Sequence, residues 1–326
     1  MAAAKDKIGY IAAARVIGIF LVVFGHSYPF DVYIPKVLWS VNEFIYAFHM
    51  PLFIFLSGYL LMGNTRSSED YIRRRSVRLL VPYIVLSVAA FVPKVLLQQF
   101  LNDTVEFSLW HLIETELVPR ANVWGHFWYI PVVFFLGCVG VILQKTVREQ
   151  PAAGWVILSA TYIALFLPRA TDWFALEDMR KTAFYFVLGM VAANWDRLTV
   201  SLTSCFWLLA FPGSLALHYL SDGIPADSMV ACLMIGFILH IGTKLNLYKN
   251  RVLFVIEKYS FTVFLLSWPA QAVVEVVCNK LLHFPALLTM GMMFAAGIGV
   301  PLVCVKIVSA LEKRIPMKWV KMIVGM

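Results

Sequence analysis

Long apolar stretches alternate with short polar ones along almost the whole chain. A membrane-spanning helix needs about 20 consecutive apolar residues, with a range of roughly 17–25. Ten stretches approach that length, and their boundaries are 8–29, 38–62, 79–100, 126–144, 152–168, 182–195, 202–220, 228–243, 256–282 and 286–310. The pattern predicts an all-α polytopic membrane protein with ten transmembrane helices, in which residues 1–326 form a single transmembrane domain.

The longest connection between predicted spans, 101–125, has a pattern of its own. Trp110, Ile113 and Leu117 recur at near-helical spacing among acidic residues such as Glu114. An amphipathic segment of this kind is typical of a helix that lies in the membrane interface. We therefore expect an interfacial helix or a lid in this connection.

Composition and charge agree with a membrane protein and orient it. Hydrophobic residues make up 61% of the chain, charged residues 14%, and the mean hydropathy is +0.78. Soluble domains run near 45–50% apolar and about 25% charged. With the N-terminus inside, 20 of the 27 Lys and Arg residues fall in inner segments, which is the distribution that cytoplasmic loops show. Both termini are therefore predicted to be cytoplasmic, and the net charge of +8 reflects topology, not a nucleic-acid partner.

The first predicted span carries two polar groups, Arg15 and His26, in the stretch RVIGIFLVVFGHSYPF. Eleven residues at 100° each end about 20° beyond three full turns, so both side chains share one helix face, about 16 Å apart along the axis. Charged groups in a bilayer are costly and typically functional. Two simpler roles stay open, a snorkelling anchor for Arg15 and a satisfied interfacial histidine for His26.

The second predicted span contains a second polar cluster, in the stretch FHMPLFIFLSGYLL. His49 precedes a helix-kinking proline, and Ser57 is followed by Gly58, which permits close helix contact. Ser57 has the alternative of a hydrogen bond to its own helix. Glu43, near the outer end, is a candidate to orient a histidine, or is simply a solvated carboxylate.

An arginine cluster precedes the third predicted span, with four arginines in the six residues RRRSVR. Arg75 and Arg78 are three residues apart and would face one way on a helix. Guanidinium groups bind phosphate bidentately, so the pair is a candidate phosphate clamp. Topology and lipid headgroup binding are the alternative.

The later spans add fewer polar groups. His126 and Trp128 open the fourth predicted span at the outer interface, where tryptophans commonly form a belt. Gln271 and Glu275 are one turn apart in the ninth predicted span and should face the interior. No cluster of histidine and carboxylate residues has metal-like spacing, so no metal site is predicted.

Four motifs in chain order resemble acyltransferase family 3, the bacterial membrane O-acyltransferases. They are R-x10-H (Arg15 and His26), FHMP-x-F-x-F-x-SG (His49 to Gly58), R-x-x-R (Arg75 and Arg78) and H-x-W (His126 and Trp128). The stretches LVVFGHS and FHMPLFIFLSGY are most similar to the fucose and surface-polysaccharide O-acetylase branch. In a late span, where many relatives have a histidine, this chain has Ser267 and Trp268. The resemblance implies a single-module transferase, without the esterase-like extension of some relatives.

The resemblance implies transfer of an acyl group, acetyl in the simplest case, from acyl-CoA to a hydroxyl of a carbohydrate or lipid-linked glycan. It implies His26 as the general base, with Glu43, His49 and Ser57 as further catalytic candidates. Acyl-CoA is then a donor substrate and no cofactor is permanently bound. Arg15, Arg75 and Arg78 are the donor-binding candidates, and His126 and Trp128 the acceptor-binding ones. The expected location is the bacterial cytoplasmic (inner) membrane, in contact with lipids.

A second function class also accommodates intramembrane polar groups. Ten spans with His26 and Glu275 inside them would suit a secondary transporter or exporter of a glycan or small anion. The sequence shows no paired Gly/Pro-interrupted segments in matching halves, which favours the enzyme. The acceptor sugar, the acyl group, the membrane side of transfer and assembly into a homo-oligomer are left open by the sequence.

Overall fold

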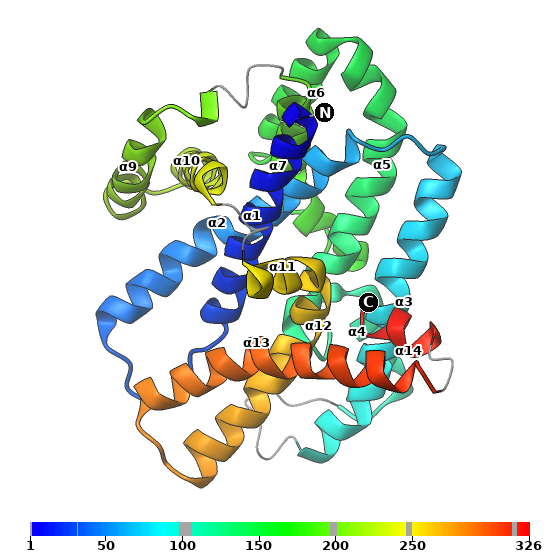
Figure 1. Cartoon of the computed structure of the whole chain (residues 1–326), viewed down its shortest axis with the longest axis vertical. Helices are drawn as coiled ribbons and strands as arrows, with labels where there is room; N and C mark the ends of the chain where they lie inside the picture. The colour runs from blue at the N-terminus through cyan, green and yellow to red at the C-terminus, as the bar shows by residue number, and fades with distance from the viewer. Residues whose placement is uncertain (1, 31, 98–105, 196–200, 246–249, 315–317) are drawn as a thin grey trace.

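The computed structural model describes residues 2–30, 32–97, 106–195, 201–245, 250–314 and 318–326, and these ranges fold into helices and connecting turns (Figure 1). The long helices are α1 (Ala2–Gly25), α2 (Lys36–Leu61), α3 (Ser68–Leu97), α5 (Tyr129–Glu149), α6 (Pro151–Ala164), α7 (Leu176–Ala193), α9 (Phe206–Leu220), α10 (Ile224–Lys244), α12 (Ser260–Glu275) and α13 (Ala286–Leu311). The shorter elements are α4 (Leu109–Leu117), α11 (Arg251–Lys258), α14 (Lys318–Ile323), the 3-10 turns η2 (Pro119–Ala121), η3 (Gly125–Trp128) and η4 (Trp173–Ala175), and a π-helical segment, Val276–Leu281.

Each of the ten predicted spans overlaps one of the long helices. Six helices in the described ranges are long and apolar enough to cross a membrane by length and composition: Lys36–Leu61, Ser68–Leu96, Gly125–Glu149, Ile224–Lys244, Ser260–Leu281 and Ala286–Leu311. Shorter apolar helices are Gly9–Gly25, Pro151–Ala164 and Phe206–Leu220. The all-α polytopic class is thereby supported, while the number of ten crossings and the inner location of both termini stay predictions.

Several helix starts differ from the predicted spans, two of them because polar caps begin helices outside the apolar core. Helix α3 begins at Ser68, well before the predicted residue 79, where the Ser67 hydroxyl accepts from Asp70 N (3.3 Å). Asn250 caps α11 in the same way, so the predicted span 256–282 is divided near Tyr259 between α11 and α12. Helix α7 begins at Leu176, before the predicted 182.

Some predictions fall partly outside the described ranges. These are residues 98–100 of the third predicted span, the first five residues of the 101–125 connection, and Arg197 and Lys249 of the inner cations. The helix expected in the connection is α4, whose N-cap Ser108 accepts from His111 N at 3.0 Å. Leu109 and Trp110 of α4 are 74% and 65% exposed, as expected of an interfacial segment.

The closest helix crossing joins α2 and α7 through two glycines. A Cβ atom on Gly58 would lie 1.9 Å from the carbonyl oxygen of Phe186, and one on Gly189 would lie 2.1 Å from that of Phe55. Each backbone therefore occupies the space that a side chain on the other helix would need. The sequence prediction that Gly58 permits close helix contact is confirmed.

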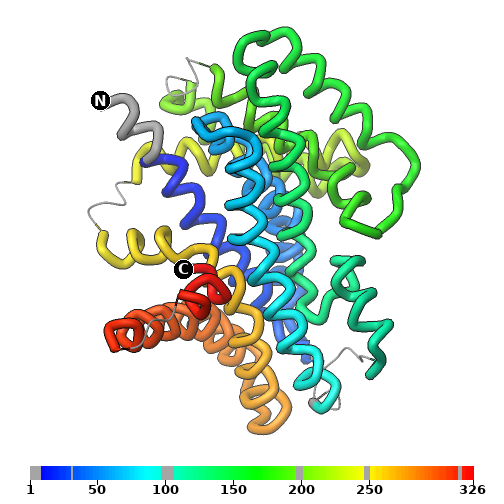
Figure 2. The backbone as a smooth tube through the Cα atoms, turned by 90° about the vertical axis from the view of Figure 1, so that its right-hand side faces the viewer, coloured from blue at the N-terminus to red at the C-terminus, as the bar shows by residue number. Residues whose placement is uncertain are grey.

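Helix α1 lies centrally, packed against α2, α10 and α12 (Figure 1). Figure 2 shows α3 and α5 side by side along one flank of the molecule. Helix α12 brings the C-terminal part of the chain back to α1, and α13 packs along α12. This arrangement places segments from both ends of the chain around α1, where the polar residues of the first span lie.

Ion pairs join the connection after α4 to the start of α7. The Arg120 guanidinium donates to Asp178 (2.6 Å at the shortest) and lies 4.0 Å from the centre of the Trp128 ring. Glu177 accepts two hydrogen bonds from Arg180, each 2.8 Å, which lower the pKa of Glu177 to about 2. Asp178 and Glu177 thus hold the start of α7 in place through their arginine partners.

Candidate functional site

Two cavities lie at different positions along α1, α2 and α12. They share no lining residue. The outer cavity, about 360 Å³, is lined by Gly25, His26, Tyr28, Phe30, Trp39, Asn42, Glu43, Tyr46, Trp268, Gln271, Ala272, Glu275 and Met293. The inner cavity, about 340 Å³, is lined by Arg15, Ile19, Met50, Phe53, Leu56, Ser57, Leu60, Leu61, Tyr71, Arg75, Arg78, Leu79, Tyr129, Val133, Ser260, Phe261 and Phe264. The cavities are called outer and inner because the N-terminal end of α1 is predicted to lie on the cytoplasmic side. Arg15 and His26 therefore open into different cavities from one helix.

The inner cavity gathers three of the predicted arginines, Arg15, Arg75 and Arg78. Arg15 forms an ion pair with Glu257 of α11 (Nη1 to Oε1, 2.5 Å). Arg75 donates from Nη2 to the carbonyl oxygen of Val133 (3.2 Å). Its Nε is buried and has no hydrogen-bond partner among the described residues. Three guanidinium groups and a single carboxylate leave this cavity suited to an anion.

The remaining arginines of the cluster point elsewhere. Arg73 and Arg74 both donate to Asp70, at 3.0 and 2.8 Å, and these hydrogen bonds lower the pKa of the Asp70 carboxyl. The RRRSVR stretch is thus divided: Arg73 and Arg74 share the Asp70 carboxylate on the helix surface, and Arg75 and Arg78 line the cavity.

A glycine on α5 makes room for Arg75. A Cβ atom on Gly137 would lie 2.7 Å from Arg75 Nε and 3.2 Å from its Cζ. Only a residue without a side chain lets the guanidinium reach this depth. Sequence reasoning missed Gly137, because a glycine in an apolar span has no local signal that distinguishes it from a packing glycine.

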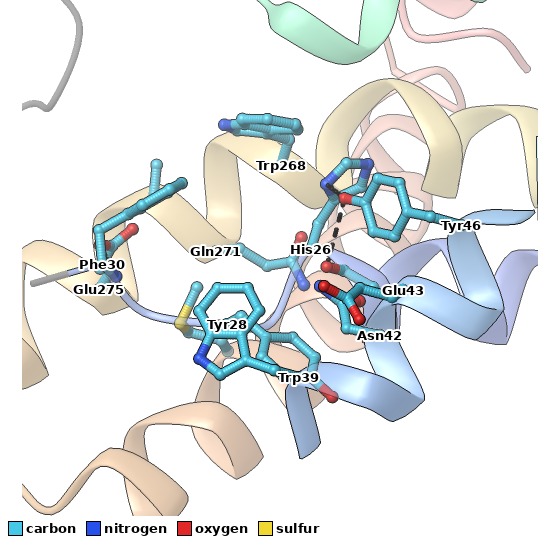
Figure 3. A pocket seen from close by; sticks show the side chains of 13 residues that line it. His26, Tyr28, Phe30, Trp39, Asn42, Glu43, Tyr46, Trp268, Gln271 and Glu275 are labelled. Carbon is cyan, nitrogen blue, oxygen red and sulfur yellow. Dashed lines mark hydrogen bonds between the residues drawn. The ribbon is translucent and has the colours of Figure 1, made fainter. Parts of the chain in front are cut away.

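In the outer cavity, His26 is oriented by Tyr46 of α2 (Figure 3). The Tyr46 hydroxyl lies 3.0 Å from His26 Nδ1 and donates to the carbonyl oxygen of Gly25 at 3.4 Å. With its proton directed to Gly25, the tyrosine oxygen is available to accept from Nδ1–H. This arrangement favours the tautomer in which Nε2 carries the free lone pair. Glu43 lines the same cavity, yet the hydrogen-bond partner of His26 is Tyr46.

A layer of rings lies between the two cavities. The Trp268 ring, which lines the outer cavity, is 4.4 Å from the His26 ring and stacks on His126 at 5.2 Å between centroids. His126 Nε2 donates to the carbonyl oxygen of Phe264 (3.1 Å), and Phe264 lines the inner cavity. His126, Trp268 and Phe264, called the ring layer below, thus connect one cavity wall to the other.

Three of the predicted site residues do not line the outer cavity together with His26. His49 is buried and donates from Nδ1 to the carbonyl of Ile45 at 2.8 Å. Ser57 lines the inner cavity and donates to the carbonyl of Phe53 (2.9 Å). This is the hydrogen bond to its own helix that the sequence left as the alternative. The Trp128 ring is covered by Arg120, and Trp128 lines neither cavity.

Ser267 and Trp268 stand in the late span where many relatives of the family have a histidine. Ser267 is buried and bonds to its own helix at Phe264 O (3.5 Å), whereas its neighbour Trp268 covers His26. Gln271 and Glu275 line the outer cavity, which confirms that they face the interior. Sequence reasoning missed Tyr46 and Glu257, since each pairs with a residue far away in the sequence, and it missed Asn42, which lines the outer cavity.

The apolar helices indicate a multi-pass membrane protein, and arginines and a histidine line two cavities between them. The sequence model of the acyltransferase domain family (family 3) matches residues 8–308. The chain belongs to this acyltransferase family, and it is a multi-pass membrane acyltransferase.

One curated relative gives further support. The chain is similar to "Nodulation protein NolL" of Mesorhizobium japonicum (strain LMG 29417 / CECT 9101 / MAFF 303099), with 27% identity over 160 residues. That match covers 48% of this chain and 40% of the relative's own length. No solved structure matches the chain.

Proposed function

We propose that the protein transfers an acyl group, acetyl in the simplest case, from acyl-CoA to a hydroxyl of a carbohydrate acceptor. The observation that carries the proposal is the arrangement along α1. Arg15 and His26 lie about 16 Å apart by helix rise and open into two different cavities. One end suits a phosphate-bearing donor and the other a hydroxyl-bearing acceptor.

The inner cavity is the proposed donor site. Acyl-CoA carries several phosphate groups, and arginine forks bind phosphate with two parallel hydrogen bonds. Arg75 and Arg78 would hold these phosphates, and Arg15 would line the entry of the pantetheine arm. Arg15 is paired with Glu257, which does not line the cavity, so a donor phosphate would compete with this carboxylate for the guanidinium. We propose the bacterial cytoplasmic membrane as the location, because acyl-CoA is available on its inner side.

The outer cavity is the proposed acceptor site, with His26 as general base. A hydroxyl is a weak nucleophile at neutral pH and needs a positioned base. His26 Nε2 would take the hydroxyl proton as the oxygen attacks the thioester carbonyl carbon. The new C–O bond forms, the C–S bond breaks, and the proton passes from His26 to the departing CoA thiolate. The products are the O-acyl glycan and free CoA.

The direct test is the substitution His26→Gln in purified protein in lipid nanodiscs. Loss of a positioned general base typically costs about 10²–10⁴-fold in rate. We expect acetyl transfer from radiolabelled acetyl-CoA to a surface-glycan extract to fall by at least about a hundredfold. His218→Gln, a histidine that lines neither cavity, is the control and should keep full activity. A folded His26→Gln protein with undiminished transfer would rule out the base assignment.

A further inference from the structure

Two amide oxygens in the outer cavity are buried with no partner. Asn42 Oδ1 and Gln271 Oε1 make no hydrogen bond with any described residue, although their residues are only 8% and 1% exposed. Buried polar atoms in folded proteins are almost always paired, so each exception calls for an explanation. Both residues line the cavity that His26 opens into.

The orientation of the Gln271 amide is fixed by its own contacts. Its Nε2 donates to the carbonyl oxygen of Val23 (2.7 Å) and to Ser27 Oγ (2.8 Å). Ser27 in turn donates its hydroxyl proton to Val23 O (2.7 Å), so it can only accept from Gln271. A flipped amide would place its oxygen against two acceptors. The unpaired atom of Gln271 is therefore the carbonyl oxygen, a hydrogen-bond acceptor.

The acidic side chains of the cavity add further acceptors. Glu43 adds a carboxylate that makes no hydrogen bond or ion pair with described residues, and no Lys or Arg is among the described lining residues. In Figure 3 the side chains of Asn42, Glu43 and Gln271 lie close together beside His26. The two unpaired amide oxygens call for a ligand that brings hydrogen-bond donors. Hydroxyl groups are neutral donors, whereas an anionic group would be repelled.

Aromatic rings supply the other wall. Trp39 and Tyr28 have ring centroids 5.5 Å apart, and the Trp268 ring lies 4.4 Å from the His26 ring between centroids. Aromatic faces pack against the C–H face of a pyranose ring while polar side chains bind its hydroxyls. The volume of about 360 Å³ lies at the small end of the usual range for ligand sites, about 300–1,000 Å³. That volume fits a terminal sugar unit.

We propose that Asn42 and Gln271 accept hydrogen bonds from two hydroxyls of an uncharged pyranoside, and so select which hydroxyl is presented to His26. The inference rests on the proposed function, because these hydroxyls belong to the acceptor that the transferase would modify. Asn42 and Gln271 are specificity-determining residues in this scheme, and neither takes part in the proton transfer.

The test uses two substitutions at Asn42 that differ in acceptor capacity. Asn42→Leu removes the oxygen at similar volume, and Asn42→Asp retains an acceptor in the same place. Since Asn42 makes no described hydrogen bond, neither change breaks a contact of the fold, and thermal unfolding checks this. Full-length protein in nanodiscs is titrated with methyl glucoside, methyl galactoside and methyl fucoside, with methyl glucuronide as the anionic probe, by saturation-transfer NMR.

Wild type should bind at least one neutral glycoside more tightly than the glucuronide. Loss of one neutral hydrogen bond should weaken that binding about three- to tenfold in Asn42→Leu, while Asn42→Asp stays within about twofold of wild type. Equal binding by wild type and Asn42→Leu, preference for the glucuronide, or no glycoside binding by wild type would each overturn the inference.

The same proteins separate this inference from the proposed function. Acetyl transfer without any effect of Asn42→Leu on the acceptor KM or on the position acetylated would refute the inference and leave the function standing. Glycoside binding that depends on Asn42, in a wild-type protein that transfers no acetyl group, would refute the function and leave the inference standing.

Discussion

At the residue scale, the hydroxyl of Tyr46 decides which nitrogen of His26 is basic. It lies 3.0 Å from Nδ1, and its own proton is directed to the carbonyl of Gly25. The tautomer of a histidine is set by the partner of its other nitrogen. Tyr46 is therefore a positioning residue for the proposed base.

Tyr46→Phe should accordingly lower kcat for acetyl transfer by roughly three- to tenfold, the value of one neutral hydrogen bond. The KM for acetyl-CoA should not change, because Tyr46 lines the outer cavity alone. Steady-state kinetics in nanodiscs measure both constants. A Tyr46→Phe protein with wild-type kcat, or with only the donor KM altered, would contradict the positioning role.

Gly137, like Tyr46, would affect the reaction through a neighbouring side chain, here that of Arg75. A Cβ atom at 2.7 Å from Arg75 Nε must displace the guanidinium. We expect Gly137→Ala to raise the KM for acetyl-CoA in the same direction as Arg75→Ala, by about tenfold if one charge-assisted hydrogen bond is lost. Gly299→Ala, where a Cβ would meet nothing within 4 Å, is the matched control. Equal donor KM values for Gly137→Ala and wild type would argue against a donor role for Arg75.

At the scale of elements, α4 is held to α3 by contacts of Tyr83. Its hydroxyl donates to the carbonyl oxygens of Glu116 (2.9 Å) and Thr115 (3.4 Å). The carboxylate of Glu116 is buried at this junction, and neither oxygen has a hydrogen-bond partner among the described residues. Burial raises the pKa of Glu116 to about 7.

This carboxyl makes the stability of the α4 junction depend on pH. Its folded-state pKa is raised above the unfolded value, so the stabilising protonated form is complete below the unfolded pKa and is lost as pH rises through about 7. The Tm of wild type should therefore decrease between pH 5.5 and 8, and Glu116→Gln should flatten that decrease. Glu106→Gln, an exposed acid ahead of α4, is the control and should leave the slope unchanged.

At this scale, the sequence could predict features that depend on neighbouring residues, but not contacts between residues far apart in the sequence. The shared face of Arg15 and His26 depends on helix periodicity alone, and the apolar lengths located the long helices. The partners of those two residues could not be predicted. Tyr46 is 20 residues from His26 and Glu257 is 242 from Arg15, so only the packing of α2 and α11 against α1 brings them together. The start of α3 was missed because a serine cap extended the helix into polar sequence.

At the scale of the whole molecule, the predicted orientation is open to a direct experiment. Twenty of 27 cations lie in segments assigned to the inside. Green fluorescent protein fused after Met326 should fluoresce, and alkaline phosphatase fused there should be inactive. Phosphatase fused after Arg120, in the outer connection, should be active, and after Asn64 inactive. An active phosphatase at Met326 would exclude ten crossings with the N-terminus inside.

The ring layer has a consequence for the cell as a whole. His126, Trp268 and Phe264 lie between two cavities that share no lining residue. In the proposed reaction, the thioester of a donor held in the inner cavity must pass this layer to reach His26, inside an energised membrane. If both cavities were joined by water, protons and ions would leak and dissipate the electrochemical gradient. In this scheme the stacked rings would close the path between the cavities while no donor is bound, and the donor arm would fill that path during transfer.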